Sequence, residues 1–222
     1  MAACHALHTL KLSLVDTDFT RLHTSIMPFP ALRVLNVEIT GTCRADAVPA
    51  TPLAPELTFY RGPAVILPLV LSGAQPEGLI ITKGRAAEVL DALRTAAHPQ
   101  WGTMLSMRVA LRDVLNGAVL RELLGLCPHL AHLTLEISSD DDGQSGPPAA
   151  TVLTKLSEIF RVHRALETIA FSWRLPDTTS IPDQVELDAL LRREVPSLRD
   201  VVFHTSLSRR QMRDFPHFTT LF

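Results

Sequence analysis

One short apolar pattern returns along the chain and constrains the possible fold more than any other feature. It has the form apolar-x-x-apolar-x-apolar, and its last positions alternate as the side chains of a β-strand do. Clear copies start at Leu7, Leu32, Leu130, Leu166 and Leu198. A strand of this kind cannot bury its apolar face alone, so it packs beside the next copy. The pattern therefore predicts a stack of similar units.

Weaker copies fill the middle of the chain. One starts at Met104, and two keep only the second and third positions, Leu57 with Phe59 and Leu79 with Ile81. The starts, real or implied, then fall at positions 7, 32, 54, 76, 104, 130, 166 and 198. Most of the steps between these starts lie near the period of about 20–29 residues of leucine-rich repeats. The longest step contains a polar insertion at 138–148, which is expected to be a loop.

Between the expected strands the apolar spacing changes to that of an amphipathic helix. Asp113 and Asp183 precede two of these helical segments and are expected to be their N-caps, and Glu186 follows Asp183 at capping-box spacing. The segments with a helical apolar face are 19–26, 89–97, 115–126, 152–160 and 187–191.

Alternating strands and helices predict an α/β fold. We expect residues 1–205 to form a leucine-rich-repeat-like, right-handed solenoid, with parallel strands on the concave face and helices on the convex face. The tail 206–222 contains three arginines and three phenylalanines. We interpret this tail as a cap over the last unit, because the open end of a solenoid needs a cover.

A doubly wound parallel sheet is the alternative fold, and it would suit an enzyme. The turn Lys83-Gly84-Arg85, ahead of an expected helix, could then bind an anionic substrate. Two features argue against this alternative. The strands are amphipathic rather than continuously apolar, and no glycine-rich phosphate loop follows the first strand.

Several segments resemble the repeat region of fungal F-box/leucine-rich-repeat-like proteins. They are Phe29–Leu35, Cys127–Leu135 and Val195–Val201, in which a Pro-x-Leu sequence heads each expected strand. The resemblance covers nearly the whole chain. It implies a protein-binding module that forms the substrate-recognition part of a ubiquitin ligase adaptor. In that family an F-box precedes the repeats, whereas the first repeat here starts at about Leu7.

We therefore expect no F-box in this chain, and docking to the ligase only if an upstream F-box exists. An inactive, truncated repeat remnant is a further alternative to a functional module.

In a repeat solenoid, the non-core positions of the strands face the partner. Here these positions mix both charge signs with hydroxyl groups, which favours a protein partner over a nucleic acid. The candidate protein-binding residues are Lys11, Ser13, Asn36, Glu38, Arg61, Arg108, Thr134, Glu136, Ser172, Asp200 and His204.

No residue combination predicts a metal site, a cofactor or catalysis, so we expect no enzyme. Cys127, His129 and His132 lack a fourth zinc ligand, and the run 140–142 of aspartates does not alternate as a calcium loop does. No Gly-x-Ser-x-Gly sequence is present either.

Overall charge and cysteine content set the expected environment. The formal net charge of −2 offers no basic field for nucleic acids or membranes. Three distant cysteines, Cys4, Cys43 and Cys127, indicate reduced thiols. The first residues lack the charged and apolar regions of a signal peptide, and the longest apolar run, 64–71, is too short to cross a bilayer. We expect a cytoplasmic or nuclear protein.

Overall fold

The computed structural model describes residues 6–45, 53–96, 102–138, 148–161, 163–174 and 182–205. Their fold is α/β, with one eight-stranded sheet in which neighbouring strands are parallel. The strands of this sheet are β1 (Thr9–Leu14), β3 (Val34–Ile39), β5 (Phe59–Pro63), β6 (Gly78–Lys83), β7 (Met104–Ala110), β8 (His132–Ser138), β9 (Thr168–Arg174) and β10 (Asp200–Thr205). Two further short strands, β2 (Thr17–Asp18) and β4 (Cys43–Arg44), form a small parallel pair.

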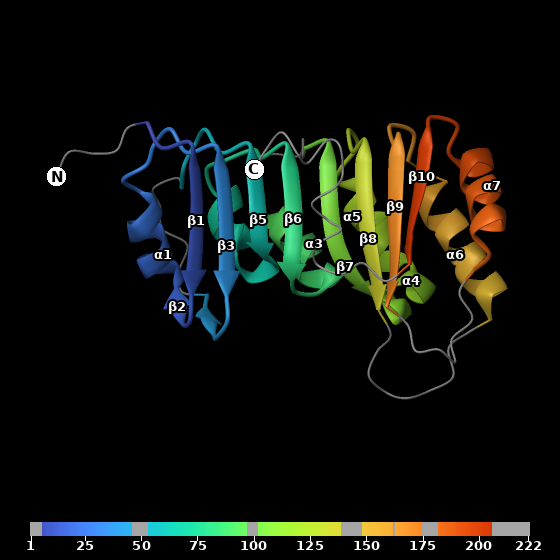
Figure 1. The fold of residues 1–222 in the computed structure, drawn as a ribbon, viewed down its shortest axis with the longest axis horizontal. Coiled ribbons are helices and arrows are strands. Elements are labelled where there is room, and N and C mark those ends of the chain that lie inside the picture. Colours follow the sequence, from blue (N-terminus) through green and yellow to red (C-terminus); the bar gives the residue numbers. More distant parts are fainter. Residues whose placement is uncertain are drawn as a thin grey trace.

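The strands lie side by side in the order in which they occur along the chain, from β1 to β10 (Figure 1). A doubly wound sheet instead reverses its strand order, and it binds its ligand where the order reverses. The order of the described strands contains no such reversal. The doubly wound alternative is therefore wrong.

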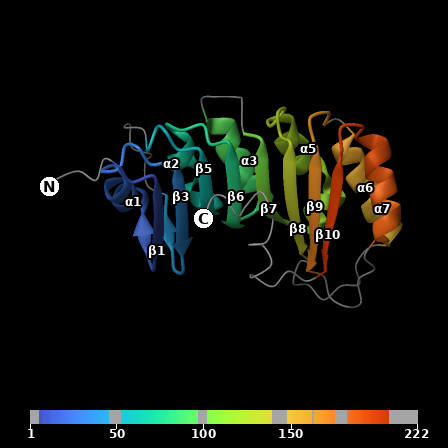
Figure 2. The ribbon, with the colours of Figure 1, turned by 45° about the horizontal axis from the view of Figure 1, so that its top comes forward.

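The described helices all lie on one face of the sheet, as Figures 1 and 2 show. We call this the covered face, and we call the other, on which no described helix lies, the open face. The helices are α1 (Phe19–Ile26), α2 (Leu67–Leu71), α3 (Ala86–Thr95), α4 (Leu111–Asn116), α5 (Ala118–Gly125), α6 (Ala149–Phe160) and α7 (Gln184–Glu194), with a 3₁₀ turn at Ala64–Ile66. Within the described ranges, no helix has both the length and the apolar character needed to cross a membrane.

The expected cap of α7 is confirmed, because a side-chain oxygen of Asp183 accepts hydrogen bonds from the backbone N–H groups of Val185 and Glu186. The expected single helix at 115–126 is wrong. Gly117, with a φ of 67°, ends α4 and starts α5. Asp113 is therefore not an N-cap and lies inside α4. Glycine adopts this left-handed conformation without a steric penalty and commonly ends helices.

The same backbone contact recurs where strands begin. The carbonyl oxygen of the residue just before one strand accepts hydrogen bonds from two consecutive N–H groups at the start of the neighbouring strand. The carbonyl of His8, for example, accepts from Arg33 and Val34, both at 2.9 Å. Such a contact fixes the register of neighbouring strands at their starts. The other carbonyls that accept two N–H groups at 2.7–3.2 Å belong to Arg33, Thr58, Thr103, Ala131 and Glu167.

A β-turn explains the recurring Pro-x-Leu sequence. The N–H of Leu130 donates to the carbonyl of Cys127 at 3.1 Å, with Pro128 at the second turn position, which the fixed φ of proline favours. The leucine side chain then enters the core, where Leu130 is 1% exposed. Equivalent hydrogen bonds join Leu32 to Phe29, Leu57 to Ala54 and Leu198 to Val195.

Two copies of the pattern have a different register from the expected one. Leu57 takes the first position, not the second, because Phe59 pairs with Val34. Met104 lies beside His132 and not beside Leu130, so this copy starts at position 102 rather than 104. β5 and β7 carry apolar side chains on both faces, and alternation alone therefore leaves their register undetermined.

The core lies between the covered face and the helices. Tyr60 is fully buried there, its hydroxyl donates to the carbonyl of Pro63 at 2.9 Å, and burial raises the pKa of this phenol well above 10. Gly62 leaves room for it, since a Cβ at that position would lie 2.3 Å from the Tyr60 hydroxyl oxygen. Farther along the sheet, Phe171 stacks between Trp173 and Phe203, with ring centroids 5.9 and 6.0 Å away.

Three sequence-based predictions fall on residues outside the described ranges. They concern Cys4, the aspartates at 140–142 in the polar insertion, and the capping role of the tail 206–222.

Candidate protein-binding face

The strand register places all eleven candidate binding residues on the open face. In the first half of the sheet, Lys11, Asn36 and Arg61 are direct neighbours across β1, β3 and β5, and Ser13 lies beside Glu38. These positions alternate with core residues such as Leu10 and Leu35, which pair with each other toward the helices.

In the second half of the sheet, four candidate residues form one row across β7, β8, β9 and β10. Arg108 pairs with Glu136, Glu136 with Ser172, and Ser172 with His204. On the same face, Thr134 belongs to the adjoining row and Asp200 to the row beyond it. Burial lowers the pKa of His204 below its usual value, because it disfavours the charged imidazolium.

An ion cluster around the buried carboxylate of Glu136 links β7, β8 and β9 beside this row. The Glu136 side chain is 10% exposed. Its Oε1 accepts a hydrogen bond from Nε of Arg108 at 2.9 Å and lies 2.7 Å from Nη2 of the same guanidinium group in an ion pair. Nε of Arg174 lies 2.7 Å from the same oxygen. Sequence reasoning did not nominate Arg174, although it occupies an alternate position of its strand as the nominated Ser172 does. We call these three residues the Arg–Glu–Arg cluster.

The open face also carries an apolar cluster that the sequence analysis missed. Val34, Phe59 and Ile80 are 9%, 4% and 9% exposed and pack together, with Met104 beside them. Gly78 makes this packing possible, since a Cβ there would lie 2.7 Å from the Phe59 ring and 2.9 Å from the Met104 methyl group. We call Val34, Phe59, Ile80 and Met104 the open-face apolar cluster.

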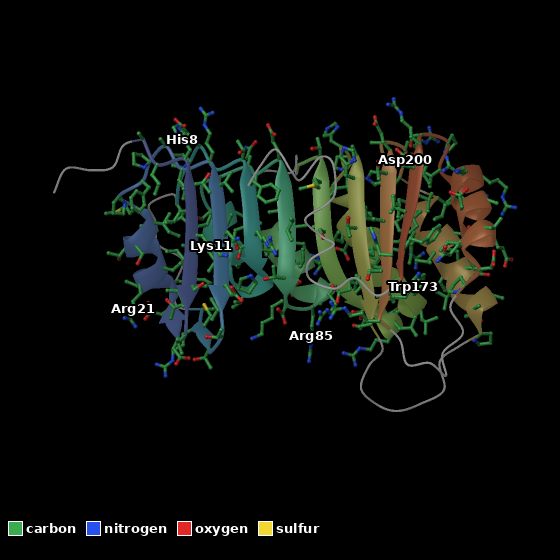
Figure 3. All side chains as sticks on the ribbon, in the orientation of Figure 1. His8, Lys11, Arg21, Arg85, Trp173 and Asp200 are labelled. Atoms are coloured by element: carbon green, nitrogen blue, oxygen red, sulfur yellow. The ribbon has the colours of Figure 1, made fainter. Side chains whose placement is uncertain are left out.

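The turn Lys83-Gly84-Arg85 has the local structure of an ordinary βα connection. It joins β6 to α3, all three residues are exposed, and the Arg85 side chain makes no capping hydrogen bond. Figure 3 shows Arg85 on the side of the sheet where the strands end, and His8 and Asp200 on the side where the strands begin.

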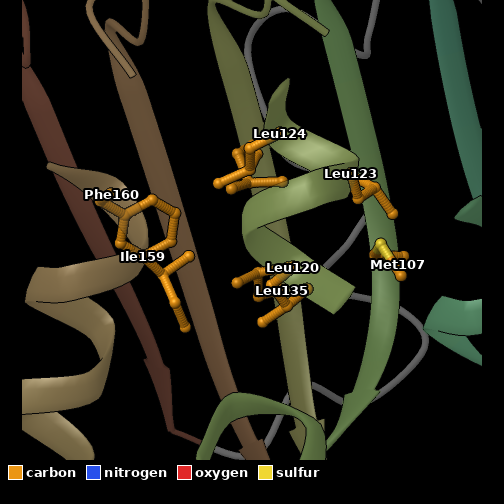
Figure 4. A pocket seen from close by; sticks show the side chains of 8 residues that line it. Met107, Leu120, Leu123, Leu124, Leu135, Ile159 and Phe160 are labelled. Carbon is orange, nitrogen blue, oxygen red and sulfur yellow. The ribbon is translucent and has the colours of Figure 1, made fainter. Parts of the chain in front are cut away.

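Two cavities among the described residues show different linings. One, shown in Figure 4, is a void of about 10 Å³ in the core, lined by eight apolar side chains that include Met107, Leu135 and Phe160. The other is a shallow depression of about 440 Å³ that His163 and Arg164 help to line. Nε2 of His163 is 2.8 Å from the Cys127 carbonyl oxygen, a contact that orients the ring.

The three residues considered for zinc do not come together. Cys127 belongs to the core, and burial raises the pKa of its thiol to about 12, which keeps it protonated and a poor ligand. His132 lies instead on the open-face side of β8, and His129 is exposed in the preceding turn. Among the described residues, no three His, Cys, Asp or Glu side chains are placed to hold a metal ion.

Comparisons with known proteins returned no matching family model, curated protein or solved structure. The resemblance to F-box/leucine-rich-repeat-like proteins therefore remains a prediction that the repeated sequence pattern alone carries.

Proposed function

We propose that the chain is a leucine-rich-repeat-like, right-handed solenoid that binds another protein on the concave, open face of its sheet. One observation carries the proposal. The face has no described helix over it, and it combines an apolar cluster with charged side chains fixed by neighbouring strands. Protein interfaces have this composition, with a buried apolar centre inside a polar rim.

The size of the open face supports this function. Eight strands define seven spacings of about 4.8 Å, and strands of this length span about 20 Å, which gives roughly 700 Å². A standard protein–protein interface buries about 800 Å² on each partner. The open face is therefore large enough to hold most of one such interface.

The mixture of charges favours a protein over a nucleic acid. Lys11, Arg61 and Arg108 share the face with Glu38 and Glu136. A phosphate backbone would require a continuous basic surface, and the formal net charge of the chain is −2.

The sequence resemblance extends this proposal to a biological role. It implies that the bound protein is a substrate of an F-box-type ubiquitin ligase, in the cytoplasm or nucleus. That role requires an F-box upstream of this module, whereas protein binding does not.

Quantitative affinity capture from the native cell tests the proposed face. A triple variant, Lys11→Ala/Glu38→Ala/Phe59→Ser, alters the open face, and Arg21→Ala/Glu88→Ala/Gln184→Ala is the matched control on exposed helix positions. We expect the open-face variant to recover a defined set of proteins at least tenfold less efficiently than wild type, and the control to recover them fully. Equal recovery by all three proteins, each folded by circular dichroism, would refute the proposal. Ligase components among the lost proteins would support the adaptor role.

A further inference from the structure

The Arg–Glu–Arg cluster holds more positive than negative charge. One buried carboxylate, Glu136, is shared by two guanidinium groups, so the cluster has an excess charge of one. The side chains of Arg108 and Arg174 are 48% and 44% exposed, whereas that of Glu136 is 10% exposed. A fixed anion beneath therefore positions two cations that still face solvent.

The hydrogen bonds to Glu136 use only part of what these cations can donate. Each guanidinium has about five N–H donors in a rigid fork. Glu136 accepts a hydrogen bond from Nε of Arg108, and its Oε1 forms ion pairs with Nη2 of Arg108 and Nε of Arg174, both at 2.7 Å. Held by their inner edges, the two groups can present their outer edges to a second carboxylate, which arginine binds with well-defined geometry.

A buried hydroxyl group lies beside this cluster. Ser172 is the register neighbour of Glu136 and is 0% exposed, and among the described residues its Oγ has no hydrogen-bond partner. Buried polar groups are usually satisfied, so this hydroxyl departs from the usual pattern.

We propose that Arg108 and Arg174, positioned by Glu136, form the docking point for a carboxylate side chain of a bound polypeptide. This inference rests on the proposed function and specifies the chemistry of the partner. Met104 of the open-face apolar cluster and Arg108 are four residues apart on β7, which corresponds to about 13 Å along an extended chain. The partner segment therefore carries an acidic residue about four positions from an apolar one.

A peptide titration of the full chain tests this docking point. The probe is a fluorescein-labelled extended peptide with a phenylalanine, three glycines and two glutamates, and its partner probe has glutamine in place of glutamate. Binding is followed by the NMR signals of the arginine Nε–H groups. We expect saturable shifts at Arg108 and Arg174, and at least tenfold weaker binding of the glutamine peptide.

The decisive variant is Arg108→Gln/Glu136→Gln/Arg174→Gln. It replaces the whole cluster with amides of similar shape, so no carboxylate is left buried without a cation. Arg85→Gln is the matched control, because both proteins lose one net positive charge on the side of the sheet where the strands end. We expect the cluster variant to bind the glutamate peptide at least tenfold more weakly, and the control to stay within twofold of wild type, with thermal unfolding confirming that both are folded.

Several outcomes would overturn the docking point. These are an absence of binding, equal weakening in the cluster variant and the control, or tighter binding of a fluorescein-labelled oligouridylate RNA than of the glutamate peptide. The capture experiment separates this inference from the proposed function. If the cluster variant recovers all partners that the Lys11/Glu38/Phe59 variant loses, protein binding on the open face stands and the acidic docking point fails.

Discussion

The two faces of the sheet are built from the same strands but differ in chemistry. On the covered face, residues such as Leu35, Leu133 and Phe171 are fully or almost fully buried against helices. On the open face, apolar side chains gather at the centre of the sheet, and charged groups lie on both sides of them. Since strand side chains alternate with period two, a change of register by one residue would exchange the faces. The covered face therefore supplies most of the buried apolar contacts, and the open face is the one that the proposed function uses.

The largest expected effect comes from a truncation on the covered face. Phe171 is fully buried and lies in ring contact with Phe160, Trp173 and Phe203. Phe171→Ala should lower the free energy of unfolding by about 3–5 kcal/mol, because it removes buried surface and leaves a cavity. Urea denaturation measures the change. A loss below about 1 kcal/mol would show that the covered face tolerates truncation and would break the comparison.

A matched truncation on the open face should cost less. Phe59 packs on Val34, Ile80 and Met104 but has no described helix above it. Phe59→Ala should lower the free energy of unfolding by about 1.5–3 kcal/mol, the usual contribution of burying such a side chain. In the same urea assay, a loss as large as that of Phe171→Ala would mean that the open face belongs to the core as much as the covered face does.

A pH titration examines the covered face by another route. Burial raises the pKa of the Cys127 thiol from 9.0 to about 12. Between these values the folded protein keeps a proton that the unfolded chain releases, so stability falls as pH rises from about 9 toward 12. Relative to Cys127→Ala, the wild-type protein should lose about 1 kcal/mol between pH 8 and 10. Parallel curves for the two proteins would contradict the burial of this thiol.

The smallest effect is expected at an exposed position of the open face. Lys11 lies on the edge strand β1 and its side chain is exposed. Lys11→Ala should change the free energy of unfolding by less than about 0.5 kcal/mol, as surface substitutions usually do. A larger loss in thermal denaturation would assign a structural role to this part of the face.

Much of the fold follows from the sequence because its strongest signals are local. Proline sets the turn that precedes Leu32, Leu130 and Leu198, and alternation assigns the flanking side chains to their faces. The α/β alternation, the parallel strands and the open-face position of all eleven candidate residues could therefore be predicted. The interpretation of that face as a binding surface stays a prediction.

Other features depend on contacts between units, which a linear pattern does not contain. Phe59 and Met104 were assigned to the wrong positions because their strands are apolar on both faces. The contact of Arg174 with Glu136 joins two neighbouring strands across 38 positions of sequence. Gly117 divides the expected helix through its backbone conformation, although the apolar stripe continues past it.

The sequential order of the strands has a mechanical consequence. β1 and β10 form opposite edges of the sheet, and each inner strand pairs only with its predecessor and successor along the chain. A force that pulls these two edge strands apart loads the inter-strand ladders in series rather than together. The hydrogen-bond ladders between strands would then break one after another, and the sheet would unfold at a lower force than one in which all ladders must break together.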